Sequence, residues 1–259
     1  MITKQEIWNR MESFGISSSD IVTVHTSLKA IGEVENGAEG LLDGMRSYLS
    51  DGILLIPTHT FRSVNAKSPY FDVKKTEPCI GVLPKIAMLH EDGYRSLHPT
   101  HSMVGFGRHA KEYLQGEEKS VTPTPVGGAL SRLYEEKGKI LLIGVDQNRN
   151  TYLHSVEERL EIQNRIAKEA FVVHISDESG HVFDTKPYHP HAISGLSEHY
   201  MKCKDAFVYA GATQERTLGK GVVTCCDVVK LTDCFLHLWK QAKGDLCLAY
   251  DSIPESFYK

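Results

Sequence analysis

The segment from Thr151 to Glu157 combines an imidazole and a carboxylate at a spacing that suits proton transfer. Thr151, His154 and Glu157 follow one another at intervals of one helical turn, so a helix would bring them to the same face. The positive end of the helix dipole favours the neutral form of His154, which can accept a proton. Glu157 can fix the tautomer of the ring and stabilise the imidazolium that then forms. The pattern fits a general base with an orienting carboxylate, and it equally fits a surface helix with an ordinary His/Glu pair.

The elements around this segment would carry the histidine to the edge of a sheet. Residues Ile140 to Val145 form a short apolar run that predicts an internal strand, and Asp146 to Asn150 supply a polar break after it. Thr151 can then cap a helix from Thr151 to Leu160 through its hydroxyl. We therefore expect His154 to lie at the carboxyl end of this strand.

The rest of the chain alternates strand and helix patterns. Strands are predicted at Ile21–His25, Ile53–Pro57 and Val222–Cys225. Helices are predicted at Lys4–Phe14, Gly37–Leu49, Val82–Leu89, Gly127–Glu136 and Val228–Ala242. Phe171–Ile175 and His181–Tyr188 flank the turn-forming residues 177–180, which predicts an antiparallel hairpin and hence a mixed sheet. We expect a single α/β domain over residues 1–259, with α/β/α layers around a mixed central sheet.

Composition narrows the class of protein. The 259 residues carry a net charge of -4, and Lys and Arg are spread along the chain, so neither a nucleic acid nor an anionic membrane is expected as a partner. No apolar stretch reaches transmembrane length or resembles a signal peptide. The six cysteines lack metal-binding spacing and are expected to be reduced, in a cytoplasmic protein. The oligomeric state is left open between a monomer and a homodimer.

Two segments follow predicted strands at the edge where open α/β sheets hold ligands. His25 to Gly32 could cradle a pyrophosphate with its N–H groups, hydroxyls and Lys29, although it contains no nucleotide-binding glycine pattern and also reads as an ordinary turn. Pro57 to Phe61 could line the same channel with its threonines, or it could simply end the strand at Pro57.

Histidine pairs raise the alternative of a metal site. His98 and His101 lie in the long irregular stretch from Leu97 to Pro125, and a second pair stands at His189 and His191. Pro99 keeps His98 out of helical geometry, so this spacing does not place both rings on one helix face. With no zinc-binding motif among thirteen histidines, no metal is expected.

Several blocks in a fixed order resemble one known family. They are VHTSLKAIG at 24–32, PTHTF at 57–61, RSLHPTHSMVGFG at 95–107, TPVGGAL at 124–130 and LLIGVDQNRNTYLHSVEE at 141–158. Together they resemble the aminoglycoside 3-N-acetyltransferase family, and residues 219–233 resemble its last strand and helix more loosely.

The resemblance implies an acetyl-CoA-dependent N-acetyltransferase whose fold differs from that of GCN5-like acetyltransferases. In this family the histidine, here His154, deprotonates the acceptor amine, and the glutamate, here Glu157, supports it. Residues implied to bind the cofactor are Thr26, Ser27, Leu28, Lys29, Ile31, Gly32, Thr58, Thr60, Phe61, Ser102, Met103 and Val104. Asp72 and Glu158 are the expected contacts of the acceptor, an aminoglycoside amine.

The expected reaction is direct acetyl transfer in a ternary complex, without an acetyl-enzyme, because no cysteine lies in a motif beside His154. The oxyanion donor is sought in Thr58 to Phe61 or in Ser102 to Val104. Residues from Val156 to Arg165 depart from the pattern of the resistance enzymes, so another amine, such as an amino sugar or amino-phosphonate, is the alternative acceptor. A metal-dependent hydrolase and a non-catalytic CoA-binding domain are the more distant alternatives.

Overall fold

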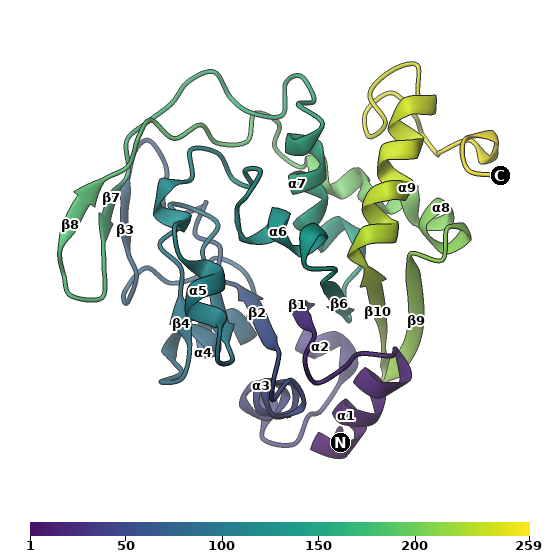
Figure 1. Ribbon diagram of the computed structural model, residues 1–259, viewed down its shortest axis with the longest axis horizontal. Helices are drawn as coiled ribbons and strands as arrows, with labels where there is room; N and C mark the ends of the chain where they lie inside the picture. Colours follow the sequence, from purple (N-terminus) through teal and green to yellow (C-terminus); the bar gives the residue numbers. More distant parts are fainter.

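The computed structural model describes all 259 residues as a layered α/β protein (Figure 1). Seven strands form the central sheet, in the order β4-β5-β2-β1-β6-β10-β9. Their bounds are β1 Ile21–Thr26, β2 Ile53–Pro57, β4 Tyr94–Arg95, β5 Met103–Phe106, β6 Lys139–Ile143, β9 Thr213–Leu218 and β10 Gly221–Asp227. The predicted strands at Ile21, Ile53 and Ile140 are confirmed, and β6 is internal, between β1 and β10.

The central sheet is mixed, as predicted. Strands β2, β1 and β6 run parallel, whereas β5 pairs antiparallel with β2 and β10 pairs antiparallel with β6. The carboxyl ends of β1, β2 and β6 therefore meet at one edge of the sheet. This edge is where the sequence blocks after Val24, after Pro57 and after Ile143 come together.

Helices cover both faces of this sheet. The α-helices are α1 Lys4–Ser13, α2 Leu28–Ile31, α3 Gly37–Tyr48, α4 Leu83–Leu89, α5 Ala110–Leu114, α6 Ala129–Glu135, α7 Tyr152–Arg159, α8 Lys204–Tyr209 and α9 Val228–Gln241. The 3₁₀ segments are η1 Glu117–Lys119, η2 Gln147–Arg149, η3 Leu196–Cys203 and η4 Glu255–Phe257. The predicted helices are confirmed, with ends within two residues of the predicted bounds.

Alternating strand residues build a separate core on each face. In β6, Ile140 and Leu142 pack with α5 to α9, whereas Leu141 and Ile143 pack with α1 to α4. This alternation follows from the pleat of a strand, which points successive side chains to opposite faces. The α/β/α architecture predicted from the sequence is thereby confirmed.

The predicted hairpin exists but lies outside the central sheet. Strands β7 His174–Ser176 and β8 Val182–Asp184 pair antiparallel, and β3 Tyr70–Asp72 adds to β7 in parallel. These strands form a small second sheet at the side of the molecule (Figure 1). The antiparallel strands that make the central sheet mixed are β5 and β10, and not the hairpin that the sequence predicts. The hairpin is too short to bury both faces, and it packs its apolar side on Phe71 and Tyr188.

All six cysteines are free thiols. No helix combines the length and the apolar character needed to span a bilayer.

Candidate active site

A large cavity opens at the carboxyl ends of the parallel strands. Its volume is about 1030 Å³, and residues from the ends of β1, β2 and β6 line it. The segment after β1 leads to α2 and α3 on one face of the sheet, whereas the segment after β6 leads to α7 on the other face. Neighbouring strands whose connections diverge in this way leave a crevice between them, which is the usual ligand site of open α/β sheets.

Backbone packing at the start of the crevice depends on one glycine after β6. Gly144 has a φ of +66°, and a Cβ atom there would approach the backbone oxygen of Ser27 to 2.8 Å. Glycine alone adopts this conformation easily and lets the two connections lie close together. The crevice therefore begins where these connections separate.

His154 lies on the wall of this cavity, in the first turn of α7. Its Nδ1 atom is 3.1 Å from Oε2 of Glu157 and 2.7 Å from the hydroxyl of Tyr200. The Tyr200 hydroxyl donates to the same Oε2 atom at 2.5 Å, so its oxygen is left to accept from the Nδ1–H of His154. These partners favour the tautomer with the proton on Nδ1, which leaves Nε2 as the proton acceptor.

A buried ion-pair network supports Glu157. Its Oε1 atom accepts from Nε of Arg165 at 2.7 Å, and Nη1 of Arg165 lies 2.7 Å from Asp245. The Glu157 and Arg165 side chains are 1% and 2% exposed. Burial alone would lower the pKa of Arg165, but the hydrogen bond with Asp245 and the charge of Glu157 raise it, so the guanidinium stays charged. Arg165 therefore balances the negative charge of Glu157, whose other oxygen bonds to His154.

Thr151 also lines the cavity, but the predicted helix cap is wrong. Its backbone has helical angles, φ -59° and ψ -22°, and its side chain makes no capping hydrogen bond. The turn η2 runs almost directly into α7, and Asp146 caps that turn by accepting from Asn148 N–H. The Thr151 hydroxyl is therefore free to face the cavity.

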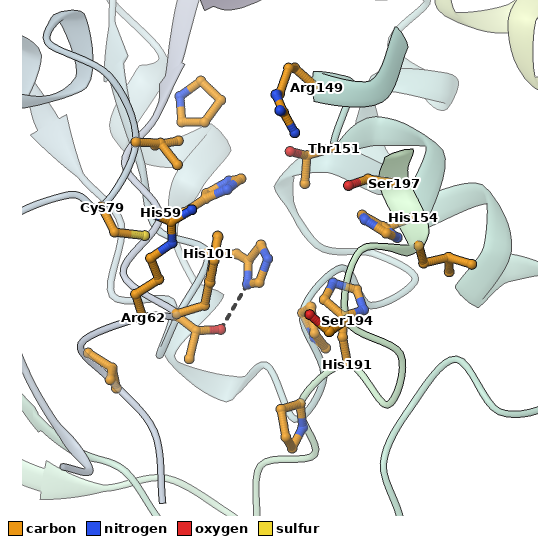
Figure 2. Close-up of a pocket in the computed structure, with 18 of the residues that line it drawn as sticks. His59, Arg62, Cys79, His101, Arg149, Thr151, His154, His191, Ser194 and Ser197 are labelled. Carbon is orange, nitrogen blue, oxygen red and sulfur yellow. Dashed lines mark hydrogen bonds between the residues drawn. The ribbon is translucent and has the colours of Figure 1, made fainter. Parts of the chain in front are cut away.

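Figure 2 shows how the labelled side chains surround the cavity. On one side lie Cys79, His59 and Arg62, and on the opposite side lie Arg149, Thr151, Ser197 and His154, with His191 and Ser194 below. The imidazoles form a row from His59 to His154. The His59 and His101 rings are 4.5 Å apart, those of His101 and His191 are 5.4 Å apart, and those of His191 and His154 are 4.3 Å apart. Burial lowers the pKa of His59, His101 and His191 well below its ordinary value, so these rings are neutral.

The fold places some of the residues predicted to bind the cofactor on the cavity wall and others away from it. Thr26 and Phe61 line the cavity. Ser27, Leu28, Lys29, Ile31 and Gly32 continue from Thr26 into α2 but are not part of its wall. Lys29 is exposed, and Ile31 is packed in the core.

The hydroxyls predicted to line the thioester channel are instead bonded inside the protein. Thr58 and Ser102 bond to each other at 3.0 Å, and Nε of the buried Arg95 donates to both. Arg95 also donates to the carbonyls of Val73 and Thr76, so it ties two strand ends to a loop. Burial lowers the pKa of Arg95 to about 10, which leaves it charged at neutral pH.

The remaining predicted channel residues are equally enclosed. Thr60, Met103 and Val104 are at most 1% exposed and are not part of the cavity wall. The strand pairing of β2 with β5 places Met103 opposite Pro57 and Val104 opposite Ile56, so their side chains enter the two cores. The sequence could not separate residues that face the crevice from those that support it.

The two residues predicted to contact the acceptor lie away from the cavity wall. Asp72 accepts from the N–H groups of Lys74 and Lys75 and so fixes a turn. Glu158 accepts from the hydroxyls of Thr122 and Thr124 at 2.5 and 2.6 Å, which ties the loop before α6 to α7. Burial raises the pKa of Glu158, and these hydrogen bonds oppose the rise.

The histidine pairs do not form a metal site. No group of three or more His, Cys, Asp or Glu side chains is arranged to hold a metal ion. Nδ1 of His98 instead accepts from the N–H groups of Thr100 and His101, which holds the turn before β5. Burial lowers the pKa of His98 to about 3.

Sequence reasoning missed Tyr200, Arg165, Asp245 and His191. Arg165 lies in the segment that departs from the pattern of the resistance enzymes, and the sequence indicates His191 only as a possible metal ligand. Tyr200 and Asp245 reach Glu157 and Arg165 from distant parts of the chain, and no local pattern marks such contacts.

A family model described as aminoglycoside 3-N-acetyltransferase matches residues 23–240. Because the match spans most of the chain, the protein belongs to this family, as the sequence blocks predicted. The matched region runs from β1 to α9 and includes His154, Glu157 and Tyr200.

Individual relatives support the same assignment. Aminoglycoside N(3)-acetyltransferase III of Serratia marcescens is 30% identical over 182 residues, which cover 64% of this chain and 67% of that protein. The chain spans about two thirds of the length of such curated relatives, with 67% and 63% of two of them matched. A structure of AAC-IIIb in binary complex with CoASH has a TM-score of 0.80 at 18% identity, covering 94% of this chain and 98% of that one. A structure of AAC(3)-IVa in complex with a gentamicin has a TM-score of 0.79 at 19% identity, covering 93% and 89%. At these identities the two structures show a shared fold.

Proposed function

We propose that the protein is an acetyl-CoA-dependent N-acetyltransferase, one domain over residues 1–259, that acetylates an amine of an aminoglycoside. The observation that carries the proposal is His154, an imidazole on the wall of a large cavity whose Nδ1 atom is bonded to Glu157 and Tyr200. Family membership and the relative bound to CoASH support acetyl-CoA as the co-substrate.

In the proposed reaction His154 acts as the general base. An acceptor ammonium must lose a proton before its nitrogen can attack, and Nε2 of His154 takes that proton directly or through a water molecule. The imidazolium that forms is stabilised by Glu157 and by the Tyr200 oxygen. The amine then attacks the thioester carbonyl, and the leaving thiolate takes up the second proton of the amine. General-base assistance of this kind contributes about 10² to 10⁴ in rate.

No acetyl-enzyme is part of this mechanism. Cys79 is the cysteine on the cavity wall, and Figure 2 shows it on the side opposite His154. Cys203 and Cys247 are buried, and burial raises the pKa of the Cys203 thiol to about 12. A thiol held protonated in this way is a poor nucleophile.

The charge of the cavity favours a second candidate acceptor. Its wall carries the acidic side chains Glu169 and Glu198 and the basic side chains Arg62 and Arg149. Asp72 and Glu158, the expected counter-charges of a polycation, are engaged elsewhere. An amine with a single positive charge, such as an amino sugar or an amino-phosphonate, needs fewer carboxylates than an aminoglycoside does. The same chemistry on such an amine is therefore the second candidate function.

The proposal is tested by release of free CoA thiol from acetyl-CoA with a panel of amines. The panel contains 2-deoxystreptamine aminoglycosides, singly charged amino sugars and an amino-phosphonate, with hydrolysis of acetyl-CoA alone as the control. Thiol release together with an N-acetylated product, identified by mass spectrometry, is expected for at least one class. Binding of CoA without transfer to any amine would contradict the enzymatic function, and transfer to the singly charged amines alone would select the second candidate.

A further inference from the structure

His191 lies beside His154 on the same wall of the cavity. The two ring centroids are 4.3 Å apart and the rings are tilted by 40°. His101 meets the other side of His191 edge-on at 5.4 Å. Figure 2 shows the rings of His154 and His191 one below the other, both among the side chains that surround the cavity.

The backbone fixes His191 relative to the base. The N–H of Ala192 donates to the carbonyl of Arg165 at 2.9 Å, and the N–H of Ala167 donates to the carbonyl of Pro190 at 2.8 Å. Arg165 is also the residue that binds Glu157. The segment that presents His191 is therefore paired with the segment that supports the carboxylate of His154.

The His191 imidazole has a polar atom without a partner. Its Nε2 atom is buried and forms no hydrogen bond within the protein. An unpartnered buried polar group destabilises the folded state. His189, two residues away, differs because its Nδ1 atom is 3.0 Å from the carbonyl oxygen of Ala167. The Nε2 atoms of His25 and His59 on the same wall are also without a partner, but of the three rings only that of His191 packs against His154.

This ring is suited to donate rather than to carry charge. Burial lowers the pKa of His191 well below its ordinary value, and the positive charge that His154 acquires lowers it further. A neutral imidazole keeps one N–H, and rotation about χ2 can turn either nitrogen toward the cavity. Neutral imidazoles of this kind can polarise a carbonyl group.

Three of the expected N–H donors for the oxyanion, those of Thr58, Thr60 and Met103, are already occupied. The N–H groups of Thr58 and Thr60 donate to the carbonyls of Ser102 and Thr100, each at 2.8 Å. The N–H of Met103 donates to the Ser96 hydroxyl at 3.0 Å. Acyl transfer still requires a donor at the carbonyl oxygen, next to the base that serves the attacking nitrogen.

We propose that the imidazole N–H of His191 donates a hydrogen bond to the thioester carbonyl oxygen of acetyl-CoA as the tetrahedral intermediate forms. The inference rests on the proposed acetyl transfer. As the bond between the amine nitrogen and the acetyl carbon forms, the carbonyl electron pair moves to the oxygen, which accepts from His191. When the carbon–sulfur bond breaks, the pair returns to re-form the carbonyl, and His191 keeps its proton throughout.

The decisive comparison is between side chains that retain a donor and side chains that do not. His191→Phe and His191→Leu are expected to lower kcat by about 10² to 10³, with the KM for acetyl-CoA changed less than threefold. His191→Asn and His191→Gln are expected to recover at least tenfold over them, because the amide can donate. His189→Asn, in the same segment but off the cavity wall, is the matched control and should stay within twofold.

Other outcomes would overturn the assignment. Equal rates for Gln and Leu, which are similar in size, would mean that His191 only packs against His154, and thermal unfolding of each variant identifies those that fail to fold. A larger loss in Thr151→Val than in His191→Leu would move the role to the Thr151 hydroxyl. If the wild-type protein transfers acetyl to no amine, the proposed function itself fails, whereas an active wild type with an equally active His191→Leu rejects only His191.

Discussion

The two sides of the cavity use polar residues in opposite ways. On the α7 side, charged groups form a chain from Asp245 through Arg165 and Glu157 to His154, and that chain ends at the cavity. On the side of β2 and β5, the buried Arg95 donates its hydrogen bonds to Thr58, Ser102 and loop carbonyls. The imidazoles there have no carboxylate partner, and burial keeps them neutral.

This difference indicates where proton transfer can occur. An imidazole can accept a proton in a buried site only if a counter-charge stabilises the cation. Glu157 provides that counter-charge for His154. The side of β2 and β5 contributes neutral imidazoles to the cavity wall. The following predictions test this division.

The largest effect is expected from removing the base. His154→Ala should lower kcat by about 10² to 10⁴, because no other imidazole on the wall has a carboxylate beside it. The dissociation constant for CoA, measured by calorimetry, should change less than threefold. His59→Ala, on the opposite side, is the comparison. An equal loss of kcat in both variants would break the proposed asymmetry.

Removing the buried carboxylate of Glu157 should reduce the stability of the protein. Glu157→Gln leaves the buried Arg165 with one carboxylate fewer and is expected to lower the free energy of unfolding by about 3 kcal/mol. The control is Glu135→Gln. Glu135 is an exposed residue at the end of α6 that pairs with Arg159 of α7, and its substitution should cost less than about 1 kcal/mol. Urea denaturation of both variants measures the difference, and similar losses would contradict a special role for the buried pair.

The neutral histidines of the cavity wall predict a loss of stability in acid. Burial lowers the pKa of His25 from 6.5 to about 4, so below pH 6.5 the unfolded chain binds a proton that the folded chain excludes. The stability is complete above pH 6.5 and is lost as the pH falls toward 4. His25→Gln should reduce this pH-dependent loss by about 3 kcal/mol, measured by urea denaturation between pH 7 and pH 4. The exposed His237→Gln on α9 serves as the control, and parallel pH curves for His25→Gln and the wild type would refute the assignment.

The asymmetry also explains which features the sequence could predict. The strands at Ile21, Ile53 and Ile140 and the helix that carries His154 follow from local apolar patterns. The contacts of Tyr200 and Asp245 depend on tertiary packing, so no local spacing could reveal them. Hydroxyls at strand ends, such as Thr58 and Ser102, were predicted to face a ligand because the pattern does not show the buried Arg95 that binds them.

The smallest effect is expected at Asp72, where the sequence predicted an acceptor contact. Its Oδ1 atom accepts from the N–H groups of Lys74 and Lys75 at 2.9 and 3.0 Å, and the residue is not part of the cavity wall. Asp72→Asn keeps an oxygen for this turn, so the KM for the acceptor should change less than twofold. Glu198→Gln, a carboxylate that does line the cavity, should raise the KM of a polycationic acceptor at least threefold, by a loss of about 1 kcal/mol of charge attraction. Steady-state kinetics at low and high salt would check both variants. A larger rise in KM for Asp72→Asn would return the acceptor site to the turn after β3 and remove Glu198 from it.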